Sequence, residues 1–178
     1  MKKIANRYSV ALFELALEED KVEEYHKQLI WLNGVFEDNT VFQFFSSVKV
    51  ESNKKKEVLD SIINENVDKN ILSFIKILID KRRMSLINVI IEQFHSLYNQ
   101  HHNIQEGVVY SIRTLSKQEL SSIEDAVGKK LESKVELKNY LNPNLISGIR
   151  IVVNDVVIDA SMQSKMAQLK EQLLKESR

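Results

Sequence analysis

The sequence contains no cysteine, and its 178 residues include only one proline and four glycines. The absence of cysteine excludes a disulfide framework, a cysteine-based zinc site and thiol catalysis, and it fits a reducing compartment such as the cytosol. Because 43% of the residues are apolar, the chain can bury one or two modest cores without disulfides or metal ions. The composition therefore predicts a fold held together by packing.

The sequence also lacks net charge, since 25 basic side chains balance 25 acidic ones. Neither half hides an excess: residues 1–103 carry 14 basic and 15 acidic side chains, and residues 104–178 carry 11 and 10. A protein that binds nucleic acid usually shows a basic excess on at least one domain, because phosphate neutralisation supplies most of the binding energy. We therefore expect no nucleic-acid partner.

Long apolar runs are absent as well. The most apolar stretches, residues 71–79 and 86–91, are interrupted by Lys76 and Asn88 and fall short of the ~20 residues that span a bilayer. The first ten residues lack the apolar region of a secretory signal. We expect a cytoplasmic protein that reaches a membrane only through a partner, without direct membrane insertion.

The first half of the chain has apolar residues at spacings of three and four, which is typical of successive amphipathic helices. Short connections between such helices favour a compact bundle. The pattern predicts six helices, over residues 3–18, 21–37, 40–47, 53–64, 69–81 and 84–102.

The second half changes pattern after Asn103, where apolar and polar residues alternate as in a half-buried strand. Ser116 and Glu119 form a capping box, flanked by Leu115 and Leu120 as a hydrophobic staple, so a helix should begin there and run to about Leu131. Further strands are expected at Val135 and Leu137, at residues 149–153 and at residues 156–158, the last two joined by a tight turn at Asn154 and Asp155. Ser161 should cap a final helix with an apolar stripe at Met162, Met166, Leu169 and Leu173.

These patterns predict an α+β protein that is mainly α. Residues 1–103 should form an N-terminal six-helix bundle, and residues 104–178 a small C-terminal α/β unit with a β-hairpin.

The sequence offers little catalytic chemistry. It has no GxxxxGK[ST], GxGxxG, HExxH or GxSxG motif, so the common phosphate, dinucleotide, zinc and nucleophile-elbow mechanisms lack their parts. His101 and His102 are adjacent at a helix end and do not share a face, which favours dipole compensation over a metal site. We expect no catalytic residues, no cofactor and no metal.

Two other charged patterns have local explanations. The runs Lys54–Lys56 and Lys81–Arg83 are best read as solvated helix surface and as compensation of helix C-termini. Asp155 and Asp159 lie four residues apart, as a catalytic carboxylate pair could, but Asp155 also suits the turn and Asp159 the strand end before the Ser161 cap.

The first and fifth helices carry more apolar surface than one core needs. On the first helix Ile4, Tyr8, Ala11, Leu12 and Leu15 form one stripe, and Val10, Phe13 and Leu17 lie roughly opposite. The fifth helix has a wide apolar arc with Ile77 at its rim beside Ser73. This extra surface is either enclosed within the bundle or offered to an amphipathic helix of a partner, docked in a groove between the two helices.

Three segments resemble one known family. Residues 7–16, RYSVALFELA, resemble the RYAxALFELA segment that begins ATP synthase delta subunits, whose mitochondrial counterpart is the oligomycin-sensitivity-conferring protein. Residues 73–78, SFIKIL, followed by Arg83, are similar to the family's NFLxLL segment, with Ser73 where Asn is usual. A third match lies in residues 145–161, a glycine-led hairpin containing Gly148, Asp155, Asp159 and Ser161, in which Ser147 and Asn154 replace frequent glycines.

The resemblance implies a non-catalytic stator connector of the rotary F-type ATP synthase, peripheral on the cytoplasmic face of the cell membrane. Residues 1–103 would bind the N-terminal helix of an alpha subunit of the catalytic head, and residues 104–178 the b subunits of the peripheral stalk. The alpha helix would lie against Ile4, Tyr8, Ala11, Leu15, Ser73 and Ile77, which leaves Val10, Phe13, Leu17, Phe74 and Leu78 for the inner core.

Two other interpretations compete with this one. The chain could be a helical adaptor of another assembly, with no link to ATP synthesis. It could also be a small enzyme that uses Asp155 and Asp159.

Overall fold

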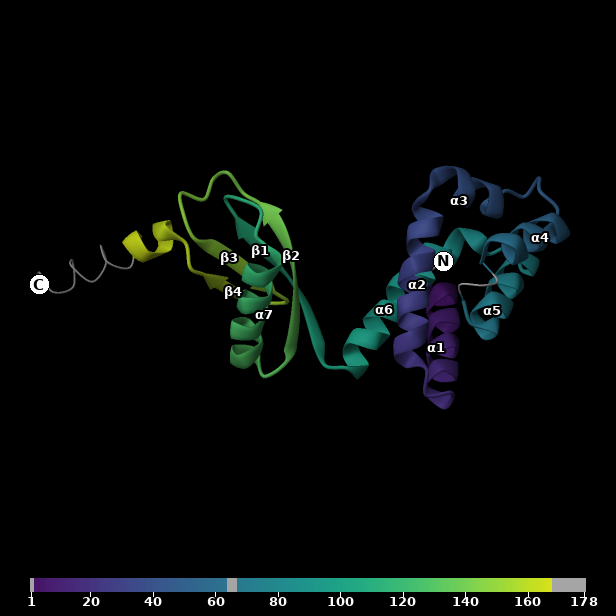
Figure 1. Cartoon of the computed structure of the whole chain (residues 1–178), viewed down its shortest axis with the longest axis horizontal. Helices are drawn as coiled ribbons and strands as arrows, with labels where there is room; N and C mark the ends of the chain where they lie inside the picture. Colours follow the sequence, from purple (N-terminus) through teal and green to yellow (C-terminus); the bar gives the residue numbers. More distant parts are fainter. Residues whose placement is uncertain (1, 64–66, 168–178) are drawn as a thin grey trace, which may run out of the picture. The chain divides into compact units, whose positions relative to one another are not determined.

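The computed structural model describes residues 2–63 and 67–167. The chain divides into two compact units, residues 1–98 and 99–178, here called the helical unit and the sheet unit (Figure 1). We expected a boundary at residue 103, whereas the division by contacts falls inside the last helix of the first unit.

The helical unit follows the predicted order of elements, with boundaries that differ by one or two residues from the sequence pattern. The exception is the sixth helix, whose first turn is a separate 3₁₀ helix. Two aspartates begin helices: Asp38 Oδ1 accepts from the Thr40 backbone N–H at 2.8 Å, and Asp68 Oδ1 accepts from the Asn70 N–H at 2.8 Å. The elements are α1 (Lys2–Glu18), α2 (Val22–Glu37), α3 (Asn39–Ser46), α4 (Ser52–Ile63), α5 (Lys69–Asp80), η1 (Met84–Leu86) and α6 (Ile87–His101).

One continuous apolar core holds these helices together, with contributions from every one of them. Its largest fully buried side chains include Tyr25, Phe36, Phe94, Leu12, Leu29, Leu32, Leu59, Ile71, Ile75 and Leu78. Such burial is the main stabilising term of a bundle of this kind.

The buried side of α1 differs from the expected one. Its contact with the core is centred on the small residues Ala5, Ser9 and Ala16, none of which is exposed to solvent. Leu12, expected on the outward stripe, is only 2% exposed, and Leu17, expected in the core, is 42% exposed. Small side chains let α1 approach its neighbours closely, so the core stripe lies between the two apolar flanks that the sequence pattern treated as opposite faces.

The basic run on α4 also differs from the expectation of solvated surface. Lys55 is 7% exposed, and its ammonium donates to the Ser47 carbonyl oxygen at 2.6 Å. Burial lowers the pKa of Lys55, with a further contribution from the nearby charge of Arg82. Lys55 therefore satisfies the C-terminal end of α3 from inside the unit.

The sheet unit contains a four-stranded mixed sheet in the order β2-β1-β3-β4. β1 and β2 are parallel and are joined by α7, which packs on one face of the sheet (Figure 1), whereas β1–β3 and β3–β4 are antiparallel. The elements are β1 (Ile104–Ser111), α7 (Lys117–Leu131), β2 (Lys134–Leu141), β3 (Ile149–Val153) and β4 (Val156–Asp159).

Local signals in this unit are confirmed. The Ser116 hydroxyl accepts from the Glu119 N–H at 3.3 Å and the Glu119 carboxylate accepts from the Ser116 N–H at 2.9 Å, which completes the capping box. Asn154, with φ of 49°, turns the chain between β3 and β4. Residues 162–167 are helical, and the Ser161 hydroxyl accepts from the Ser164 N–H at 3.2 Å as predicted for a cap; the rest of the predicted stripe, Leu169 and Leu173, lies outside the described residues.

The described part of the chain is thus mainly helical with a small mixed sheet in its second unit, which confirms the predicted fold class at that level.

Candidate functional site: a groove between α1 and α5

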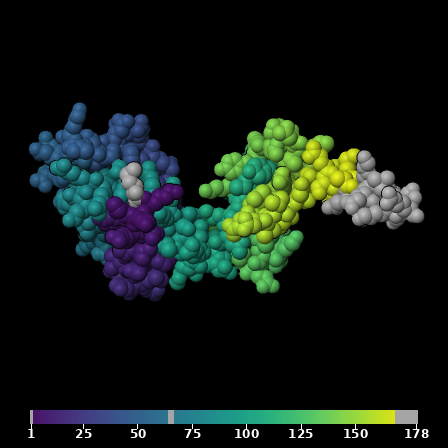
Figure 2. All heavy atoms as spheres, turned by 180° about the vertical axis from the view of Figure 1, so that it is seen from behind, coloured from purple at the N-terminus to yellow at the C-terminus, as the bar shows by residue number. Residues whose placement is uncertain are grey.

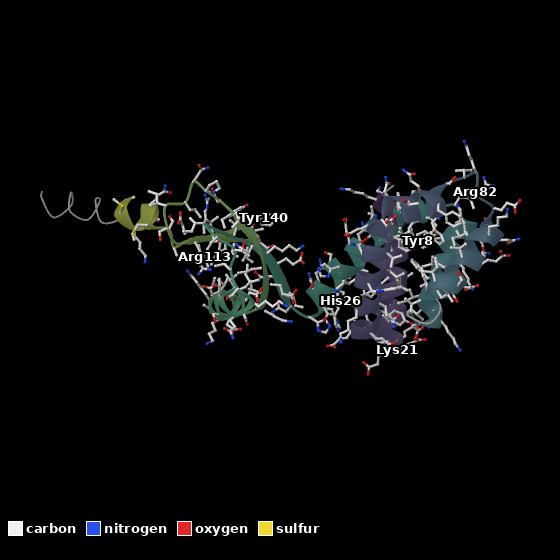
Figure 3. The ribbon with its side chains drawn as sticks, turned by 45° about the horizontal axis from the view of Figure 1, so that its top comes forward. Tyr8, Lys21, His26, Arg82, Arg113 and Tyr140 are labelled. Atoms are coloured by element: carbon white, nitrogen blue, oxygen red, sulfur yellow. The ribbon has the colours of Figure 1, made fainter. Side chains whose placement is uncertain are left out.

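α1 and α5 lie side by side and run antiparallel. Near the start of α1, the Tyr8 ring meets the Phe74 ring edge-on with centroids 5.9 Å apart. Beyond the end of α1, the Glu19 carboxylate accepts a hydrogen bond from the Asn70 side chain at 2.7 Å, at the start of α5. Figure 3 labels Tyr8, in the second turn of α1, and Lys21, which follows the end of that helix.

A groove of about 330 Å³ lies between the two helices. Five of the six residues that the resemblance implied line it, namely Tyr8, Ala11, Leu15, Ser73 and Ile77, together with Leu12, Asn70 and Phe74. The sixth, Ile4, is 37% exposed on α1 and is not part of this lining. Figure 2 shows α1, in purple, at the surface of the helical unit. We call these eight residues the α1–α5 groove.

Tyr8 is fixed at one end of the groove by a cation. Arg83 Nη1 donates a hydrogen bond to the Tyr8 hydroxyl at 2.7 Å, and the guanidinium carbon lies 5.6 Å from the centroid of the Tyr8 ring. In the sequence Arg83 stood out in two ways, as part of a basic run that was read as dipole compensation and as the arginine after the SFIKIL segment, but neither pattern predicted its contact with Tyr8. Arg83 therefore places a positive charge beside an apolar groove.

A polar network closes the other end of the groove. The Tyr25 hydroxyl donates to Glu19 Oε2 at 2.8 Å and accepts from the Asn70 side chain at 3.0 Å. Lys21 pairs with Asp68 at 2.8 Å, and this hydrogen bond lowers the pKa of the Asp68 carboxyl. Burial raises the pKa of Tyr25, so its hydroxyl remains a donor. The network ties α1, α2 and α5 together and fixes the spacing of the groove walls.

The floor and rim of the groove are mostly apolar. Ile77 is 49% exposed, and Ala11 is exposed beside it on α1. The Ser73 hydroxyl donates to the Lys69 carbonyl oxygen within its own helix at 2.8 Å, so it does not have to donate a hydrogen bond into the groove. Such a groove suits the apolar face of an amphipathic helix, which supplies anchors at spacings of three and four residues.

The hairpin residues of the third matched segment have structural roles. Gly148 has φ of +90°, and a Cβ there would lie 2.4 Å from the Ala160 carbonyl oxygen, so only glycine fits without strain. Asp159 Oδ1 accepts from the Ser161 N–H at 2.9 Å, and hydrogen bonds from Ser161 lower the pKa of the Asp159 carboxyl. Asp155 lies exposed in the β3–β4 turn. A lowered pKa is the opposite of what a general acid at neutral pH requires.

Other polar clusters do not assemble a reactive site within the part of the chain that is described. No group of three or more His, Asp or Glu side chains there could hold a metal ion. His101 and His102 lie at the end of α6 with their rings edge-on. His26 and His95, which the sequence did not bring together, share a hydrogen bond of 2.7 Å, and His26 also stacks on Tyr98.

A larger depression of about 950 Å³ lies along β2 and α7 in the sheet unit. Its walls carry many charged side chains, among them Glu106, Glu124, Asp125, Lys129 and Lys138. Glu124 already accepts the Leu137 N–H at 2.8 Å and so occupies part of the strand edge. This depression suits an apolar helix less well than the α1–α5 groove does.

The fold and the groove define a class: a mainly helical two-unit protein with an apolar surface groove between two of its helices. Comparison with known proteins agrees. Residues 4–173 match the sequence model of the family described as ATP synthase delta (OSCP) subunit. The chain belongs to this family.

Two relatives support the family assignment, and a solved structure shares the fold. The chain is 31% identical to ATP synthase subunit delta of Bacillus mycoides strain KBAB4 over 174 residues, which cover 97% of this chain and 96% of the relative. It is 30% identical to the subunit of the same name from Bacillus cytotoxicus over 173 residues, with 97% and 96% covered. Its fold matches a chain in the Toxoplasma gondii mitochondrial ATP synthase hexamer with a TM-score of 0.69 at 19% identity, over 96% of this chain and 97% of that one.

The family sets the general function. The protein is a non-catalytic stator component of the peripheral stalk of the F-type ATP synthase, and it serves ATP synthesis and ion transport through that complex. The predicted stator function is confirmed, and with it the prediction that the chain is not itself an enzyme. Within the described ranges, no helix is both long and apolar enough to cross a bilayer.

Proposed function

We propose that the helical unit is a six-helix bundle that binds the N-terminal helix of an alpha subunit in the α1–α5 groove, and that the sheet unit, from residue 104 onward, binds the b subunits. The protein would then connect the catalytic head to the peripheral stalk and resist the torque of the rotor. The observation that carries the proposal is the groove itself, whose lining contains five of the six implied contact residues.

The chemistry of the groove supports a helix as its occupant. Its walls present apolar side chains from two antiparallel helices, with polar groups concentrated at the ends. Ile77 and Ala11 are exposed in the isolated chain, so a bound helix would remove their apolar surface from water. Attraction of this kind is little weakened by cellular salt, unlike attraction between exposed charges.

The sheet unit carries exposed apolar side chains that a stalk partner would cover. On β1 and β2, Tyr110 and Tyr140 are paired in register with ring centroids 6.4 Å apart. They lie on the sheet face opposite Val109, which packs with Val127 of α7. Further exposed apolar side chains of this unit are Ile112, Leu141, Ile146, Val156, Val157, Met162 and Met166. So much exposed apolar surface on a small unit is typical of an interaction site.

Two moderate interfaces on one chain are sufficient for a durable connection. Once one unit is bound, the other meets its partner at a high effective concentration, so neither interface needs extreme affinity. In this proposal the protein lies on the cytoplasmic face of the cell membrane and is held there through the other subunits.

Capture of the intact protein from membranes tests the proposal, with identification of the subunits that accompany it. We expect alpha and b subunits with the unmodified chain, and loss of the direct alpha contact in Ile77→Asp. Ile62 on α4 is 51% exposed and lies outside the groove lining, so Ile62→Asp is the matched control. If the two variants retain alpha subunits equally, the groove is not the alpha-binding site.

A further inference from the structure

The charges of α1 oppose the helix's own dipole. Lys2 and Lys3 lie in its first turn and Glu18 in its last, with no acidic residue at the start and no basic residue at the end. A helix is normally stabilised by the reverse arrangement, because its N-terminus is partially positive and its C-terminus partially negative. Because these charged side chains do not stabilise α1 through its dipole, we expect them to interact with something outside that helix.

These charges continue at the two ends of the α1–α5 groove. Lys81 lies one turn beyond Ile77, since its N–H donates to the Ile77 carbonyl oxygen at 3.0 Å. Arg83 contacts Tyr8, and Arg7 is exposed next to it in sequence. We call this the basic end of the groove.

The opposite end is acidic. The Glu19 N–H donates to the Leu15 carbonyl oxygen at 3.1 Å, so Glu19 lies one turn beyond the groove residue Leu15. Glu18 and Asp20 flank it and are exposed. Lys21 is engaged by Asp68 and lies 3.7 Å from Glu19; the exposed Lys69 at the start of α5 is the other cation here. The acidic side chains outnumber these two cations.

We propose that the helix bound in the groove runs antiparallel to α1, with its N-terminus at the acidic end and its C-terminus at the basic end. The inference rests on the proposed function, because it assigns a direction to the helix bound there. The first N–H groups of the bound helix, which have no partner within it, would face Glu18 and Asp20. Its last carbonyl groups would face the donors of Lys81 and Arg83. In the opposite direction, the partially positive N-terminus of the bound helix would face the basic end, and its partially negative C-terminus would face the acidic end.

Nitroxide labelling of a bound peptide reads this direction. The probe is a synthetic peptide of the alpha-subunit N-terminus from the same ATP synthase, labelled at either end and added to the ¹⁵N-labelled intact protein. We expect the N-terminal label to broaden the amide signals of Glu18 and Asp20, and the C-terminal label those of Arg7 and Lys81. The reverse pattern would overturn the direction and leave the proposed function intact. Absence of binding, or broadening confined to other surfaces, would overturn both.

A charge reversal gives a second readout. Glu18→Lys improves the charge pattern of α1 itself, so weaker peptide binding could not come from a destabilised helix. We expect affinity to fall about two- to fivefold, the size of a charge–dipole contact at a helix end. Glu14→Lys makes the same change on α1 one turn away from the end and should change affinity less, because the effect is confined to the terminal turn. Equal losses in both variants would indicate general attraction and would contradict the proposed direction.

Discussion

Arg83 and Tyr8 are 75 residues apart in the chain and joined by a hydrogen bond of 2.7 Å from Nη1 to the phenol oxygen. The bond connects the segment after α5 to the second turn of α1, so it joins the α1 wall of the groove to the chain that follows the α5 wall. It also orients the Tyr8 ring against Phe74. Tyr8 is therefore held in place before any partner arrives, which lowers the entropic cost of binding.

Tyr8→Asp should weaken binding of an alpha N-terminal peptide by ~1–3 kcal/mol, as expected for an interface anchor. The substitution removes the ring from the groove wall, together with its edge-on contact with Phe74. Tyr8 is only half-buried, so the helical unit should remain folded. Calorimetry measures the affinity and circular dichroism the fold. Tyr140→Asp, an exposed tyrosine of the sheet unit, should leave the peptide affinity unchanged; an unchanged affinity in Tyr8→Asp would refute the site.

The fragment of residues 1–103 should fold alone. Its helices share one apolar core that includes Tyr25, Phe36 and Phe94, so the interactions that stabilise it lie within the fragment. We expect a cooperative thermal transition followed by circular dichroism and resistance to proteolysis like that of this region in the intact chain. A molten profile with rapid cleavage would contradict the two-unit description.

Gly148→Ala should destabilise the sheet unit by about 1–3 kcal/mol, because alanine at φ of +90° is strained and its methyl group would collide with the Ala160 carbonyl oxygen. Amide hydrogen exchange in β3 and β4 would report the loss.

Gly34→Ala is the control, since no atom lies within 4 Å of a Cβ placed at that helical position. It should stabilise the helical unit by about 0.5–1 kcal/mol. If amide hydrogen exchange in β3 and β4 is the same in Gly148→Ala as in the unmodified protein, the backbone before β3 can shift to accommodate a methyl group. That result would contradict the tight contact with the Ala160 carbonyl oxygen.

Acid should weaken the start of α7 through Glu119. Hydrogen bonds from Arg113 and then from Ser116 lower the pKa of Glu119 to about 2 from its ordinary value of 4.5. Because the folded pKa is the lower one, this contribution to stability is present above pH 4.5 and is lost as the pH falls from 4.5 toward 2.

Denaturant titrations of the sheet unit at several pH values would measure this effect. Glu119→Gln should reduce stability above pH 4.5 and flatten the dependence below it. Asp125→Asn, at an exposed position on the same helix, should retain the slope. A slope that survives in Glu119→Gln would assign the acid sensitivity to other groups.

Local rules explain why so much of the secondary structure could be predicted from the sequence. The capping box at Ser116 and Glu119 and the turn at Asn154 involve residues close together in the chain, so their geometry depends little on the rest of the fold. Apolar spacing likewise marked both groove helices, because a helix surface repeats at a fixed interval. The three segments that resemble the delta family then indicated the function.

Tertiary contacts determined which side chains are buried and which distant residues meet, and local patterns did not predict this. The sequence by itself determined which helices would form and that α1 and α5 have surplus apolar surface. Only packing decided that Leu12 is buried and Leu17 exposed, because the small side chains of Ala5, Ser9 and Ala16 set how α1 rotates against the core. Packing also buried Lys55 and brought Arg83 to Tyr8. Such pairings depend on where distant segments meet, and periodicity within one helix carries no information about that meeting.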